Sequence, residues 1–185
     1  MTSMIERLIP SNLKTRGFWK IIIECVDTKN RPIGIYLPGI LFVQVLFDGD
    51  GFFDLDNCEK KAYIIDKVME ATECLTDNGF DEVEILKSIC DEIIRLDYVN
   101  EWFYGKFYYN CDKSVGIKVS HEVDKARIYM VFKDKEKRVL KERLLVETEP
   151  DEWAYCKYLG KLKWISEYAA QLVTKSGDVF IESMQ

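Results

Sequence analysis

Four aspartates and two glycines crowd into the eleven residues 46–56, with the sequence LFDGDGFFDLD. Carboxylates at this density can coordinate calcium, line an acidic active site or surround a turn. An EF-hand calcium loop needs an oxygen ligand at position 5 and a glycine at position 6. Counted from Asp48, those two positions are occupied by Phe52 and Phe53. The pattern therefore favours a turn from a strand into a helix over a calcium site.

Helix capping at the end of this stretch accounts for its last aspartate alone. Asp48 and Asp50 are not needed for capping, and with Asp54 they form an acidic rim around an aromatic ring, Phe52 or its neighbour Phe53. An apolar ring within a charged rim is typical of protein-docking surfaces. We therefore expect a protein partner to contact Asp48, Asp50, Asp54 and Phe52.

A second unusual stretch is EWFYGKFYY, residues 101–109, with six aromatic side chains in nine residues. On an extended strand, Trp102, Tyr104 and Tyr108 share one face, and three further aromatic residues share the other. One face is expected to pack in the core and the other to expose rings suited to an interface. We assign Trp102, Tyr104 and Tyr108 to partner binding. The alternative is a strand that is buried on both faces.

Catalytic signatures are sparse. The single histidine, His121, excludes every site that needs two histidines, and no phosphate-binding glycine loop or GxSxG turn is present. Cys111 and His121 could form a nucleophile–base pair, but no turn or helix start presents the thiol, which favours a histidine bonded to backbone or water. The six cysteines lack CxxC pairing, as expected of free thiols. We expect no catalytic residue, metal ion or cofactor, although carboxylate pairs need no fixed spacing and leave a small enzyme as an alternative.

Charge is distributed unevenly along the chain. The net charge is −6, yet residues 48–101 carry sixteen acidic and five basic side chains. An acidic surface repels phosphate backbones, which argues against nucleic acid and in favour of a basic protein partner. Solvated helix faces are the simpler explanation for many of these charges.

Hydrophobic periodicity predicts an α+β fold of mostly antiparallel sheet. Its parts are a meander over 17–47, a helical hairpin over 57–96 and a second meander over 102–148, with a C-terminal helix over 151–173 packed on the sheet. A short strand is expected over 178–183. With no linker or repeat in 185 residues, we expect one domain, 1–185.

Local signals set the details of these elements. Asp56 is expected to cap the first helix of the hairpin and Gly79 to end it. Asp81 and Glu84 have the spacing of a capping box for the second helix. The adjacent apolar residues 144–146 break the alternation of their strand and predict a bulge.

The start MTSMIERLIP lacks the features of a signal peptide, and no apolar run is long enough to span a bilayer, so we expect a cytoplasmic protein that does not contact membranes. Small size, acidity and many aromatic residues resemble the general character of immunity proteins that neutralise bacterial toxins, although no diagnostic motif carries the likeness. We expect a protein-binding inhibitor that blocks a basic toxin. The alternatives are a small enzyme with a carboxylate or Cys–His site and a regulatory subunit of a larger complex. Nothing in the sequence indicates an oligomeric state.

Overall fold

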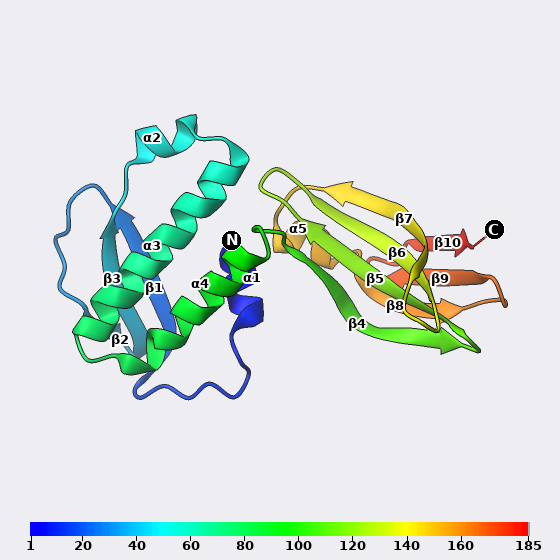
Figure 1. Ribbon diagram of the computed structural model, residues 1–185, viewed down its shortest axis with the longest axis horizontal. Helices are drawn as coiled ribbons and strands as arrows, with labels where there is room; N and C mark the ends of the chain where they lie inside the picture. Colours follow the sequence, from blue (N-terminus) through cyan, green and yellow to red (C-terminus); the bar gives the residue numbers. More distant parts are fainter. Residues whose placement is uncertain (185) are drawn as a thin grey trace. The chain divides into compact units, whose positions relative to one another are not determined.

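The computed structural model describes residues 1–184 and divides the chain into two compact units, Met1–Val99 and Asn100–Gln185 (Figure 1). The described residues form five α-helices and ten strands in three sheets, which confirms the α+β fold. This division does not test whether the two units fold as one domain, so the single domain 1–185 remains a prediction.

The first unit contains one three-stranded sheet and most of the helical residues. Its elements are α1 (Thr2–Leu8), β1 (Phe18–Val26), β2 (Gly34–Leu37), β3 (Gly39–Leu46), α2 (Gly49–Asp54), α3 (Asn57–Asp77), the 3-10 turn η1 (Asp81–Glu84) and α4 (Ile85–Arg95). The strand order is β1-β3-β2, so β3 is central, as its continuous apolar run indicates.

The expected meander over 17–47 is wrong in its topology. β2 and β3 pair antiparallel, but β1 pairs with β3 and not with β2, because the loop after β1 passes the end of β3 before β2 begins. The neighbours β1 and β3 therefore form a parallel pair. A parallel pair needs such a crossing, whereas a hairpin does not. Sequence periodicity defines the strands and leaves the order in which they pair open.

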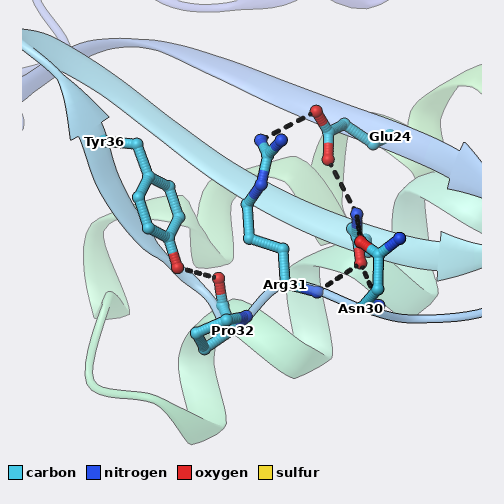
Figure 2. A network of polar contacts seen from close by, with 6 residues as sticks. Glu24, Asn30, Arg31, Pro32 and Tyr36 are labelled. Atoms are coloured by element: carbon cyan, nitrogen blue, oxygen red, sulfur yellow. Dashed lines mark hydrogen bonds and ion pairs between the residues drawn. The ribbon is translucent and has the colours of Figure 1, made fainter.

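Gln44 holds this crossing loop in place from the middle of the sheet (Figure 2). Its Oε1 accepts hydrogen bonds from the backbone N–H groups of Asn30 (2.8 Å) and Arg31 (3.0 Å), and its Nε2 donates to Glu24 Oε2 (3.0 Å) and Asn30 Oδ1 (3.1 Å). Arg31 Nη1 lies 3.0 Å from Glu24 Oε1, and the Tyr36 hydroxyl donates to the Pro32 carbonyl (2.6 Å). The one polar side chain of the apolar run thus satisfies the backbone of the loop that crosses it.

The helical hairpin is confirmed, with α3 and α4 packed beside each other (Figure 1). Asp56 caps α3 as predicted and forms a full capping box with Glu59, and Gly79 ends the helix at φ +86°. The second capping box is wrong, because Asp81 and Glu84 lie in η1 and the residue before it, Phe80, makes no side-chain cap. The hairpin packs its apolar side on β3 to form the first core, which includes Leu41, Val43, Val45, Ile65, Leu75, Ile89 and Ile93.

The second unit begins with an antiparallel meander, close to the predicted bounds. Its strands are β4 (Glu101–Asn110), β5 (Lys113–His121), β6 (Ala126–Asp134) and β7 (Val139–Thr148), in the order β4-β5-β6-β7. The register of β7 against β6 shifts at Leu145, which confirms the predicted bulge.

The C-terminal helix is wrong beyond its first turn. The helix α5 covers only Glu152–Cys156, and the chain then forms β8 (Gly160–Trp164), β9 (Ala169–Thr174) and β10 (Val179–Ser183), paired in the order β10-β9-β8. Burial alternates strictly along β9, the period of a strand. The aromatic spacing that suggested a long helix spans α5, a turn and β8. The short strand expected over 178–183 is confirmed as β10.

The two sheets of the second unit share one core, in which side chains of β5 and β6 pack against those of β8 and β9. The sheets also meet at their edges: Trp164 Nε1 donates to the Tyr108 carbonyl (2.9 Å), and Arg143 Nε lies 3.5 Å from Glu182 Oε1. This unit is a small sandwich with its own closed core.

Candidate functional site

The acidic stretch forms a short helix between β3 and α3. Asp48 is the N-cap of α2, and its Oδ1 accepts a hydrogen bond from Gly51 N (3.0 Å). A Cβ on Gly51 would lie 2.3 Å from the Asp48 carboxylate, so the glycine makes room for this cap. The expectation that Asp48 serves no capping role is therefore wrong. Asp50 and Asp54 are the exposed carboxylates of α2 that do not cap the helix.

Aromatic packing fixes α2 on α3. The ring of Phe52 lies 5.1 Å from Phe47 and 5.7 Å from Tyr63, and Phe47 lies 5.3 Å from Tyr63, all between ring centroids. The Tyr63 hydroxyl also accepts a hydrogen bond from Asp48 N (3.1 Å). Phe52 is thus half-buried in a cluster that positions the helix.

The ring that α2 presents to solvent is Phe53, which is 76% exposed. It stands edge-on to Phe52, with ring centroids 5.9 Å apart, and its chain neighbour Asp54 and the nearby Asp50 are exposed carboxylates. The exposed ring on this acidic helix is therefore Phe53, while Phe52 packs inward. Lys60 is a cation beside them: its Nζ donates to the Phe53 carbonyl (3.2 Å) and lies 5.9 Å from the ring centroid of Phe52.

A shallow depression of about 400 Å³ adjoins this helix, and its lining includes Asp27, Leu46, Asp48 and Lys67. Lys67 Nζ lies 2.9 Å from Glu70 Oε2, and this hydrogen bond raises the pKa of the Lys67 ammonium and lowers the pKa of the Glu70 carboxyl. The charge of Lys67 is therefore largely compensated by Glu70. The depression combines an exposed apolar side chain, Leu46, with two carboxylates.

The predicted aromatic anchors lie on β4, in the other unit. Trp102, Tyr104 and Tyr108 are half-buried and pack against the core between the two sheets. A bulge with Gly105 at φ +68° adds two residues between Tyr104 and Tyr108, which leaves both on the same face, as the alternation predicts. The more exposed rings of β4 belong to the opposite face.

Those exposed rings are Phe103 and Tyr109, which are 36% and 74% exposed. The structure therefore groups the seven predicted residues into two sets, one on α2 and its cap and the other on the core side of β4. Phe53 and Tyr109 are the rings that the sequence assignment left out. Alternation alone does not reveal which face of an aromatic strand is covered, and the short α2 has too few residues for a periodic signal.

The Cys–His pair is not assembled. Cys111 lies in the turn before β5 and His121 is the last residue of β5, so the strand separates them by about 26 Å at roughly 3.3 Å per residue. His121 Nε2 lies 2.9 Å from the Pro150 carbonyl, and burial lowers the pKa of this histidine. A backbone-bonded histidine at a strand end is the interpretation that the sequence favoured.

Within residues 1–184, no three His, Cys, Asp or Glu side chains are grouped as a metal site would require. No helix in that range is long and apolar enough to cross a membrane. Comparison with protein-family models, with curated proteins and with solved structures finds no match for this chain.

Proposed function

We propose that this protein is a protein-binding inhibitor that docks on a basic partner through α2 and the depression beside it. The proposed class is an immunity-type protein that acts in the cytoplasm and neutralises a basic bacterial toxin by covering its active surface. The mechanism is steric and electrostatic, so it needs no catalytic group on this chain.

The observation that carries this proposal is the exposed ring of Phe53 on α2, a short helix that also carries the exposed side chains of Asp50 and Asp54. A large apolar ring in water gains free energy when a partner covers it, and aromatic residues dominate the binding energy of many interfaces. Because Phe52, Phe47 and Tyr63 hold the helix, the ring is presented from a fixed position, which reduces the entropy lost on binding.

Long-range charge supports a basic partner. Residues 1–99 carry 18 acidic and 11 basic side chains, a net charge of −7, whereas residues 100–185 are nearly neutral. The field of an acidic surface raises the rate at which a basic protein encounters it and disfavours acidic competitors. The proposal therefore rests on the first unit, since Trp102, Tyr104 and Tyr108 pack in the core of the second.

The direct test is capture of the partner from the source cells on immobilised protein. The proposal expects a basic protein whose own activity is lost when the two are mixed at equal concentration. Replacing Phe53 by alanine should then raise the dissociation rate about tenfold or more, the effect typical of a central aromatic anchor.

The matched control is Trp153→Ala, which removes another highly exposed aromatic side chain, 86% exposed, from the second unit. Equal dissociation rates for wild type, Phe53→Ala and Trp153→Ala would place the interface away from α2. A partner that keeps full activity in the complex would rule out inhibition.

A further inference from the structure

A second concave site lies on the second unit, at the end of the four-stranded sheet where the β4–β5 and β6–β7 turns meet. In an antiparallel meander these two turns share one end, while the β5–β6 turn lies at the other (Figure 1). The pocket has a volume of about 300 Å³, at the lower end for sites that take small ligands. Residues that line it include Phe107, Tyr109, Ser114, Lys133, Lys135 and Lys137.

The side chain of Lys133 and the backbone of Lys137 are held in position by their surroundings. The Lys133 ammonium stands 4.1 Å from the ring centroid of Phe103 and 4.7 Å from that of Phe107, a cation–π contact that orients the group and leaves its N–H donors available. Lys137 lies in a tight turn at φ +65°, where its N–H bonds the Asp134 carbonyl (3.0 Å). Among the described residues, neither Lys133 nor Lys137 forms an ion pair.

The carboxylates at the pocket do not cancel this positive charge. Asp134 accepts hydrogen bonds from Arg138 Nε (2.7 Å) and Arg138 N (2.8 Å), so its charge is compensated from outside the pocket. Lys135 is loosely paired with Glu136 at 3.8 Å. Asp112 is the one lining carboxylate not engaged by an arginine, against four lining lysines, one from β5 (Lys113) and three from β6 and the β6–β7 turn.

From this arrangement we infer that the pocket binds a small aromatic molecule that carries a phosphate group, such as a nucleoside monophosphate. The phosphate is held by Lys133 and Lys137, and the flat ring stacks on the exposed side chain of Tyr109. Lysine ammonium groups are compact point charges that suit phosphate, whereas planar carboxylates are recognised best by the arginine fork. Arg138, which follows the lining residue Lys137 in the chain, is bound to Asp134. The site shares no residue with α2, so the result of its test does not bear on the proposed docking function.

Calorimetric titration of the full chain with adenosine 5′-monophosphate tests the inference, with adenosine and inorganic phosphate as the two partial probes. Each half of the ligand should contribute, so both partial probes should bind at least about tenfold more weakly than the complete molecule. Lys137→Gln should weaken binding of the monophosphate about tenfold and Tyr109→Ala by a similar factor, because both side chains are exposed and their loss leaves the fold intact.

Asp112→Asn tests the direction of the electrostatic effect: removal of a negative charge beside the phosphate should tighten binding of the monophosphate several-fold. Lys161→Gln, which removes an exposed lysine of β8, is the control and should leave the affinity unchanged. The inference is overturned if the wild-type protein binds no monophosphate at millimolar concentration, if adenosine or phosphate alone binds equally well, or if Lys137→Gln and Lys161→Gln behave alike.

Discussion

Gln44 makes four hydrogen bonds from a strand whose neighbouring side chains are apolar: three bind the loop after β1, at Asn30 and Arg31, and the fourth binds Glu24 on β1. The sequence marks Gln44 as the exception in an apolar run, so the central position of β3 could be predicted. Its partners could not, because Glu24 and Asn30 come close only through the crossing of the loop. In the same way, the exposed carboxylates could be predicted, while the choice between Phe52 and Phe53 as the outer ring depends on how α2 winds.

Replacing Gln44 by leucine should lower the free energy of unfolding by about 2 kcal/mol, since it leaves the N–H groups of Asn30 and Arg31 without their acceptor. Urea denaturation measures the change. The matched control is Gln171→Leu on β9, a half-buried glutamine in the other unit, for which a change within about 0.5 kcal/mol is expected. Equal losses for the two variants would show that the hydrogen bonds of Gln44 do not contribute to the free energy of unfolding.

The buried thiol of Cys90 should make the stability of the protein depend on pH. Cys90 is fully buried on α4, and burial, together with the charge of Asp91, raises the pKa of its thiol to about 11. Above the ordinary thiol pKa of about 8.5 the unfolded chain loses this proton while the folded protein retains it, so stability falls as pH rises from about 9 to 11. The free energy of unfolding should drop by up to about 2 kcal/mol from this group.

The control for this pH profile is Cys90→Ala, which is less stable at every pH but should lose less stability between pH 9 and 11 than the wild type. Parallel profiles for the two proteins would contradict the assignment to Cys90.

At the scale of elements, segments with a clean period were predictable, as α3 and the four strands of the second meander show. Capping signals at Asp56 and Gly79 set the ends of α3 because they act locally. The region after α5 was misassigned because Trp153, Tyr155 and Trp164 have helical spacing although they belong to different elements. Burial, which decides between the two periods there, depends on the sheet opposite and not on local sequence.

Gly160 gives this region a test of its own. It begins β8 so close to β9 that an added Cβ would lie 2.0 Å from the Val173 carbonyl oxygen. Gly160→Ala should therefore destabilise the protein by about 1–3 kcal/mol through overpacking of backbone against side chain. The control is Gly49→Ala in α2, where nothing lies within 4 Å of the new methyl group and little change is expected. Thermal unfolding that ranks the two variants equally would contradict the pairing of β8 with β9.

At the scale of the whole molecule, the chain has two separate cores, one in residues 1–99 and one in residues 100–184. Each unit is large enough to bury a core of its own. We expect fragments 1–99 and 100–185, expressed separately, each to unfold cooperatively on heating, as followed by circular dichroism. If neither fragment folds alone, the chain is the single domain that its length and lack of a linker predict.

The central claim is that the carboxylates of α2 steer a basic partner onto Phe53, and the association rate measures this most directly. The double variant Asp50→Lys/Asp54→Lys should slow association with the captured partner by roughly tenfold or more at low salt, and the difference should shrink in 0.5 M salt because ions screen the field. The control Glu73→Lys/Asp91→Lys makes the same change in net charge at exposed positions of α3 and α4 and should have a much smaller effect. Equal association rates for the two double variants would contradict the claim.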